Sequence, residues 1–174
     1  MRAIVEAAAR NSGAALSGGE VAPTNQAAVL SPRGRLTVMR WGFPRWDGKG
    51  QVINARSETA GEKAMFRDCL RTGRCLIPAS WYYEWEKRGA ERVRYALRPP
   101  ETPVLWLAGL CRRDPAAGED RFVILTRPAA PGLAFLHDRM PVILPGESRR
   151  TWLRGGDPLS ALAEADEELL YKTG

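Results

Sequence analysis

The sequence has only one histidine, three cysteines and four lysines among its 174 residues. One histidine and three cysteines without Cys-x-x-Cys spacing do not make a structural zinc site. An odd number of cysteines also does not suit a framework of disulfides. Cys75 opens the apolar run CLIPAS and is predicted to be a small buried side chain. We therefore expect neither a metal nor another cofactor.

Long hydrophobic runs are also absent. No segment approaches the roughly 18 uninterrupted apolar residues that a membrane span needs. The opening segment contains Glu6 and Arg10, which argues against a signal peptide. The composition, 44% hydrophobic and 26% charged, is typical of a soluble globular protein. We expect a single domain over residues 1–174, with one sizeable core, in the cytoplasm.

Positive charge is concentrated in the middle of the chain, although the net charge is only +6. Residues 31–98 contain 15 Lys or Arg and 7 Asp or Glu, whereas residues 155–174 contain one lysine and five acidic residues. Arginine supplies 22 of the 26 basic residues, and its planar fork suits phosphate groups. A basic middle region indicates a polyanionic partner, most commonly nucleic acid. An ordinary arginine-rich solvated surface is the alternative.

Short strand patterns dominate the chain. Two short strands are predicted within 26–43, around the Ser-Pro-Arg-Gly turn at 31–34, and further strands at 74–80, 81–87, 92–98, 104–113, 121–129 and 140–144. Helices are predicted at 1–13, 62–73 and 146–155, a helical turn at 131–137, and an acidic amphipathic helix at 157–171. This pattern favours an α+β domain built on a mainly antiparallel, barrel-like β-sheet with a few flanking helices.

The segment VINARSE, residues 52–58, places polar side chains inside a strand pattern. Asn54, Arg56 and Glu58 alternate along it, so an extended strand would present all three on one face. Buried charge is costly without partners, so such a face is either solvated or functional.

Two further segments have the same character. Glu84 lies among Trp81, Tyr83 and Trp85, where lost hydration should raise its pKa toward that of a general acid. His137, the only histidine, is followed two residues later by Arg139. Together the three segments would suit proton transfer on a substrate that bears phosphates. Taken singly, each could also be a solvent-facing polar residue or part of an ordinary salt bridge.

Seven stretches of the sequence resemble one known family in the same order. They are VAPTN (21–25), RWGFPRW (40–46), INARSET (53–59), MFRDCLRTGRCLIPASWYYEW (65–85), LAGL (107–110), FVILTRPA (122–129) and HDRMPVIL (137–144). The family is SRAP, the SOS response-associated peptidases, which includes abasic-site-processing proteins of the 5-hydroxymethylcytosine-binding type. Each stretch alone is weakly specific, whereas the ordered set is highly specific.

The resemblance implies an enzyme-like function in DNA repair. SRAP proteins bind single-stranded DNA, or its junction with duplex, and cross-link covalently to abasic sites. The nucleophile is a cysteine directly after the initiator methionine, which the protein itself removes. Its α-amine forms a Schiff base with the opened sugar, and its thiol then closes a thiazolidine. By the same resemblance the protein would be a cytoplasmic monomer, associated with the nucleoid when on DNA, and without a membrane partner.

The resemblance also assigns roles to individual residues. Asn54 would position the cysteine and the sugar, Glu84 would move protons during methionine removal and ring opening, and His137 would act on the Schiff base. The residues predicted to contact DNA are Arg56, Arg139, Trp46, Trp41, Pro23 and Thr126. Of the two tryptophans in this set, Trp41 is expected to lean toward the core and Trp46 toward an exposed position where it could stack on a base.

The sequence departs from the family at its start. The family begins Met-Cys-Gly-Arg, whereas this chain begins Met1-Arg2-Ala3-Ile4 and stops short of a Pro-rich tail. We interpret the chain as an SRAP-like domain truncated at both ends; the alternative is a degenerate member that has lost the nucleophile. A non-catalytic module for binding single-stranded DNA remains the competing function. A peptidase acting on other proteins is disfavoured, since His137 has no recognisable Ser-His-Asp set around it.

Overall fold

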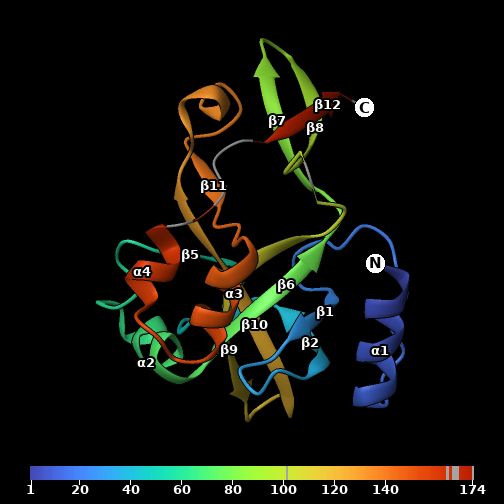
Figure 1. The fold of residues 1–174 in the computed structure, drawn as a ribbon, viewed down its shortest axis with the longest axis vertical. Coiled ribbons are helices and arrows are strands. Elements are labelled where there is room, and N and C mark those ends of the chain that lie inside the picture. Colours follow the sequence, from blue (N-terminus) through green and yellow to red (C-terminus); the bar gives the residue numbers. More distant parts are fainter. Residues whose placement is uncertain (101, 164, 166–168, 174) are drawn as a thin grey trace.

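The structure is a computed structural model and describes residues 1–100, 102–163, 165 and 169–173. Most of its elements are short strands, and Figure 1 shows how the helices lie around them. In chain order the elements are α1 (Arg2–Ser12), β1 (Gln26–Leu30), β2 (Leu36–Trp41), β3 (Phe43–Pro44), β4 (Gln51–Val52), β5 (Asn54–Arg56), α2 (Ala64–Thr72), β6 (Arg74–Ala79), β7 (Tyr82–Arg88), β8 (Glu91–Arg98), β9 (Leu105–Asp114), β10 (Glu119–Pro128), the 3₁₀ helix η1 (Pro131–Leu133), β11 (Arg139–Pro141), α3 (Gly146–Leu153), α4 (Pro158–Ala163) and β12 (Leu170–Thr173).

Five strands close into a ring of hydrogen-bonded strands, in the order β10, β2, β1, β6, β9 and back to β10. Every pairing in the ring is antiparallel except β10–β2, in which Arg121 and Phe122 lie opposite Arg40 and Trp41. β5 makes a second parallel pairing with β10, and β11 pairs antiparallel with the end of β10. The predicted α+β fold with a mainly antiparallel sheet is confirmed.

Ring strands β1, β6, β9 and β10 each carry at least three consecutive buried residues, which explains their nearly continuous apolar runs. On β10, Phe122 and Ile124 belong to a cluster that takes side chains from all five ring strands. The alternate residues Val123 and Leu125 belong to a second cluster, on the side covered by α2, α3 and α4. The fully buried Trp152 of α3 lies in this second cluster, and its indole Nε1 donates a hydrogen bond to the Cys75 carbonyl at 3.0 Å.

A three-stranded sheet of β7, β8 and β12 stands at one end of the molecule, at the top of Figure 1. The buried face of β8 packs against the segment that follows β10, where Tyr95 and Leu97 meet Leu133 and Leu136. The Tyr95 ring also makes an edge contact with Phe135, at 5.8 Å between ring centroids. This packing brings β7 close to residues 131–138, a segment more than 40 positions later in the sequence.

The predicted helix at 157–171 is wrong over its C-terminal part. α4 ends at Ala163, and Leu170–Thr173 form β12, which pairs antiparallel with β8; residues 164 and 166–168 lie outside the described residues. The edge of β8 offers unpaired backbone groups, and Tyr171 packs its ring against Tyr95 and Phe135. These tertiary contacts override the helical periodicity that the sequence alone displays.

The other predicted elements agree with the structure. The helices expected at 1–13, 62–73 and 146–155 are α1, α2 and α3, and the five successive strands are β6 to β10. The strand expected at 140–144 is shorter, because β11 ends at Pro141 and Ile143 makes only an isolated bridge to Leu107. Among the residues that the structure describes, no helix combines the length and apolarity that crossing a bilayer requires.

Candidate functional site

β5 presents two of the predicted site residues to solvent. Asn54 and Arg56 are exposed and Ala55 between them is buried, as the alternation predicts. In the parallel pairing with β10, Asn54 lies opposite Ile124 and Arg56 lies opposite Thr126. The prediction for Glu58 is wrong in one respect. The strand ends at Arg56, and Glu58 follows in a turn that begins with the Ser57 amide donating to the Thr126 carbonyl at 2.8 Å.

Arg139 joins this turn to β10 and β11. Its Nη1 and Nη2 donate to the two carboxylate oxygens of Glu58 at 2.5 and 2.8 Å. Nη2 also donates to the Thr126 carbonyl at 2.7 Å and lies 3.3 Å from the Thr126 hydroxyl. These hydrogen bonds from Arg139, opposed only in part by burial, lower the pKa of Glu58 to about 2. Glu58 is therefore an anion across the physiological pH range.

His137 lies just before β11, with its ring about half exposed. Its Nδ1 accepts a hydrogen bond from the Arg139 backbone N–H at 2.9 Å and lies 2.9 Å from Asp138 Oδ1. A neutral ring can accept the amide hydrogen at Nδ1, which puts its own proton on Nε2, whereas a protonated ring donates from Nδ1 to Asp138. Either way the contacts engage Nδ1 and leave Nε2 for a substrate.

Glu84 is partly buried on β7, and desolvation raises its pKa, as predicted. The charge that His137 can carry opposes this rise, so the two side chains lie within electrostatic reach of one another. Burial and the Glu84 charge also raise the pKa of Tyr82, which shares this face of the strand. A glutamate with a raised pKa beside a histidine is an arrangement suited to proton transfer.

The prediction that Tyr83 and Trp85 shield Glu84 is wrong. Tyr83 and Trp85 point to the opposite face of β7, where both rings lie against Arg94, 3.7 and 5.8 Å from their centroids. On its own face Glu84 lies next to Tyr82 and directly across from Tyr95 of β8. Side chains alternate across a strand, so the immediate sequence neighbours of Glu84 cannot cover it.

Trp41 and the loop that carries Pro23 are held together beside β5. The Trp41 indole donates to the Ile53 carbonyl at 2.9 Å and stacks on Phe122. The Thr24 amide donates to the Trp41 carbonyl, and Thr24 has a φ of 73°, a value that residues other than glycine rarely adopt. The expected packing of Trp41 toward the core is confirmed; contacts of Trp41 and Pro23 with DNA stay predictions.

Trp46 lies apart from these residues, in the connection between β3 and β4. Its side chain is 89% exposed, the most exposed large hydrophobic residue described. The connection itself is ordered by Arg45, whose guanidinium binds Asp47 and whose amide donates to the Gly50 carbonyl. The expected exposed position of Trp46 is confirmed, and its stacking on a base stays a prediction.

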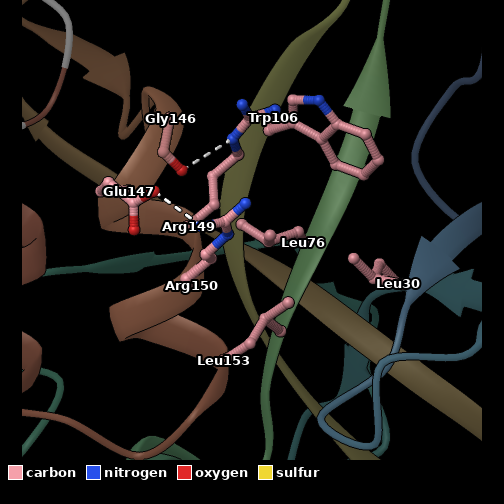
Figure 2. A pocket seen from close by; sticks show the side chains of 8 residues that line it. All are labelled: Leu30, Leu76, Trp106, Gly146, Glu147, Arg149, Arg150 and Leu153. Carbon is pink, nitrogen blue, oxygen red and sulfur yellow. Dashed lines mark hydrogen bonds and ion pairs between the residues drawn. The ribbon is translucent and has the colours of Figure 1, made fainter.

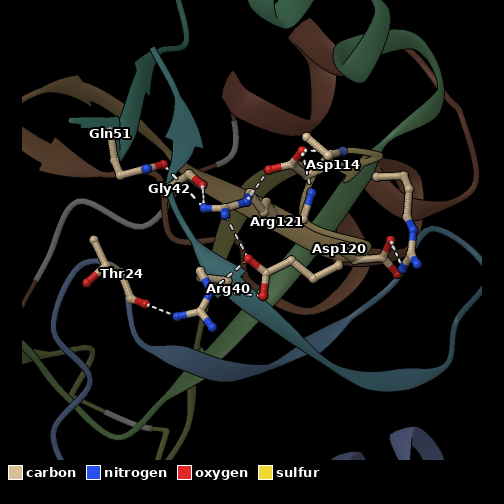
Figure 3. Close-up of polar contacts among 11 residues, drawn as sticks. Thr24, Arg40, Gly42, Gln51, Asp114, Asp120 and Arg121 are labelled. Atoms are coloured by element: carbon tan, nitrogen blue, oxygen red, sulfur yellow. Dashed lines mark hydrogen bonds and ion pairs between the residues drawn. The ribbon is translucent and has the colours of Figure 1, made fainter. Parts of the chain in front are cut away.

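A chain of charged residues that the sequence did not reveal supports the Pro23 loop (Figure 3). Arg121 forms ion pairs with Asp114 and Glu119, both at 2.7 Å. Glu119 also pairs with Arg40, whose Nη1 donates to the Thr24 carbonyl at 2.7 Å. Asp114, Glu119 and Arg121 lie on the β9–β10 hairpin. Arg40 joins them only through the parallel β10–β2 pairing, which no sequence spacing signals.

Comparison with known proteins decides the family. The family model described as SOS response associated peptidase (SRAP) matches residues 3–172. The chain belongs to the SRAP family. Its relatives include the abasic site processing protein YedK of Escherichia coli, 34% identical in an alignment of 143 residues that covers 77% of this chain and 63% of YedK. The abasic site processing protein HMCES of Xenopus tropicalis is 31% identical over 70% of this chain and 46% of HMCES.

Solved structures share the fold of this chain. A protein from Bordetella bronchiseptica has a TM-score of 0.74 at 27% identity, over 95% of this chain and 93% of that one. A protein from Bacteroides thetaiotaomicron has the same fold, with a TM-score of 0.76 at 24% identity, over 86% and 74% of the two chains. The SRAP chain described here spans less than two thirds of the length of the curated relatives named above.

None of the three cysteines of this SRAP chain lies at the site surface. Cys69, Cys75 and Cys111 are all buried, and burial raises the pKa of Cys69 and Cys75. The predicted burial of Cys75 is confirmed, since its side chain is fully covered. Burial leaves these three thiols unreactive toward a large substrate.

Proposed function

We propose that this chain binds single-stranded DNA along β5, β10 and β11 and takes part in processing abasic sites. The relatives named above are abasic site processing proteins, which supports this substrate class. The observation that carries the proposal is the placement of Glu84 and His137 within electrostatic reach of one another. Across β10 from β11, exposed Asn54 and Arg56 face solvent on β5.

The chemistry of an abasic site suits this pair. In its open form the sugar presents an aldehyde, and an amine that attacks it forms a carbinolamine, which must lose water to become a Schiff base. Loss of water needs a proton donor, and a glutamate whose pKa is raised retains a proton to higher pH than an exposed one. His137, with Nδ1 engaged, offers Nε2 to take or return a proton in the same step.

The covalent part of the family mechanism needs a thiol next to an α-amine. In this sequence Arg2 follows Met1, and the three cysteines are buried. We therefore assign DNA binding and proton transfer to the residues described here, and no thiazolidine to Cys69, Cys75 or Cys111. Autoproteolytic removal of methionine and cross-linking are proposed only for a form that carries the family's cysteine.

The test uses fluorescence anisotropy with two single-stranded oligonucleotides, one intact and one with a single abasic site. We expect both to bind at low salt, the abasic one more tightly, and Glu84→Gln to reduce that preference without lowering affinity for the intact strand. Heating in detergent should release all DNA from the polypeptide. Absence of binding at low salt, or a heat-stable adduct formed without a reductant, would contradict the proposal.

A non-catalytic DNA-binding module is the second candidate, and the burial of all three cysteines favours it. The same titrations separate the two functions. A pure binding module should hold intact and abasic strands equally and should be indifferent to Glu84→Gln. Equal affinities together with a strong dependence on salt would select this second function.

A further inference from the structure

The guanidinium of Arg139 has no pair of neighbouring N–H groups free to bind a phosphate. It carries five N–H bonds. Both hydrogens of Nη2 are used by Glu58 and Thr126, and one hydrogen of Nη1 is used by Glu58. The Nε–H is buried and has no partner among the described residues. One hydrogen of Nη1 remains, and a single hydrogen cannot form the paired contact by which arginine binds oxyanions.

Of the two ion-pair partners, Glu58 is the one able to leave. The Arg139 side chain is only 17% exposed and is anchored to the Thr126 carbonyl, whereas the Glu58 side chain is 44% exposed and lies in a turn. Among the described residues, Glu58 has one other side-chain hydrogen bond, which the Ser57 hydroxyl donates at 3.2 Å. The Glu58 carboxylate can reach solvent without moving Arg139, so an incoming anion can exchange with it.

We propose that Glu58 is a gate: its carboxylate occupies the phosphate position on Arg139 in the DNA-free protein, and a DNA phosphate reaches Arg139 only by displacing it. The proposal rests on the proposed function, since it names a competitor within the same site. A carboxylate and a phosphate both accept two parallel N–H bonds from one guanidinium. Exchange therefore preserves the hydrogen bonds of Arg139 while it releases Glu58 to solvent.

The gate distinguishes a phosphate that is tethered in a DNA strand from a free anion. Arg56, exposed on β5 two residues before Glu58, has no ion pair or hydrogen bond among the described side chains and can hold one phosphate first. A neighbouring phosphate on the same strand then meets Arg139 at a high effective concentration. A free anion lacks this tether and must displace Glu58 unaided. We infer that the site favours successive phosphates of one nucleic-acid strand over isolated small anions.

Three variants test the gate by DNA affinity. Glu58→Gln removes the competing charge and should lower the dissociation constant for an intact single strand about fivefold, the change expected if the gate is closed about four-fifths of the time. Glu147→Gln is the matched control. It makes the same charge change and breaks the ion pair with Arg150 on α3, and it should change affinity less than about twofold. In the double variant Glu58→Gln/Arg139→Ala the gain should disappear.

Sulfate provides a readout independent of DNA. Because the Nε–H of Arg139 is buried, its NMR signal is protected from solvent exchange, and it reports on what the guanidinium binds. Sulfate at constant ionic strength should shift this signal to saturation in Glu58→Gln, and the wild type should need about fivefold more sulfate for the same shift.

Equal responses of the two proteins to sulfate, including no response in either, would overturn the gate. So would a Glu58→Gln protein that binds DNA no better than Glu147→Gln, provided that the wild type binds DNA. If no variant binds DNA, the proposed function fails, and the sulfate titration alone decides the gate.

Discussion

At the scale of single residues, the surroundings of two glutamates near the site shift their pKa values in opposite directions. Glu58 receives two hydrogen bonds from Arg139, which lower its pKa to about 2, whereas burial raises the pKa of Glu84. The first remains a negatively charged carboxylate at every physiological pH and can compete with a phosphate for Arg139. The second holds its proton longer and suits acid–base chemistry. Residue type alone does not separate these roles, because the surroundings of each carboxylate decide them.

Replacing Glu84 should change stability in a pH-dependent way. Its raised pKa means that the unfolded chain ionises first as pH rises through the ordinary value of 4.5, and this penalises the folded state. Glu84→Gln removes the penalty, so we expect the Tm to rise by about 2–4 °C at pH 7 and to stay unchanged at pH 4. Calorimetry at the two pH values measures this. A gain of equal size at both would show that burial of the charge is not the cause.

Trp46 and Trp41 should separate binding from stability. Trp46→Ala removes an exposed ring and should leave the Tm unchanged while weakening single-strand binding by about 1–3 kcal/mol, the usual value of stacking on one base. Trp41→Phe removes the hydrogen bond to the Ile53 carbonyl and should cost about 1 kcal/mol of stability. Urea denaturation and anisotropy on both variants measure this. A Trp46→Ala protein with unchanged affinity would exclude stacking.

At the scale of elements, strand pairing assembles the site from segments far apart in the chain. Thr126 of β10 pairs with two strands, with β5 parallel on one side and β11 antiparallel on the other. Arg56 and Pro141 therefore lie opposite the same residue, and Arg139 reaches across to Thr126. The β7–β8–β12 sheet then brings Glu84 to His137. Loss of any of these pairings would separate the residues to which we assign the proposed function.

β12 should hold the β7–β8 hairpin in place through Tyr171. Its ring lies 5.4 Å from Tyr95 and 6.0 Å from Phe135, centroid to centroid. Tyr171→Ala should destabilise the protein by about 1 kcal/mol and speed amide exchange along β8, while Tyr171→Phe, which retains the ring, should not. Hydrogen exchange followed by mass spectrometry tests this. Slow exchange along β8 in Tyr171→Ala would show that β12 contributes nothing to the hairpin.

At the scale of the whole molecule, the net charge of +6 favours a polyanion at a distance, but only residues that touch phosphates set the salt dependence. Arg56→Ala should reduce the slope of log affinity against log salt by about 0.7 for a single strand. Arg10→Ala, on the exposed face of α1, removes the same charge and should lower affinity slightly without changing the slope. Titrations at four salt concentrations measure both, and equal slopes would remove Arg56 from the interface.

The sequence by itself determined the family, the antiparallel character of the sheet and the solvent-facing pair Asn54 and Arg56. These follow from local order: ordered motifs, runs of apolar residues and alternation along a strand. It also predicted that Glu84 would have a raised pKa, though from the wrong neighbours, since Tyr83 and Trp85 turned out to lie on the other face.

Only the tertiary structure decided which partners these residues meet. The pairing of Glu58 with Arg139 spans 81 positions and that of Arg121 with Gly42 spans 79, and neither leaves a trace in local spacing. β12 formed where the sequence reads as a helix, because the open edge of β8 and the rings of Tyr95 and Phe135 outweigh a periodicity of 3.6. Hydrogen bonds and ion pairs depend on the distance between atoms in space. The closed ring of strands therefore determines which residues pair, and their order along the chain does not.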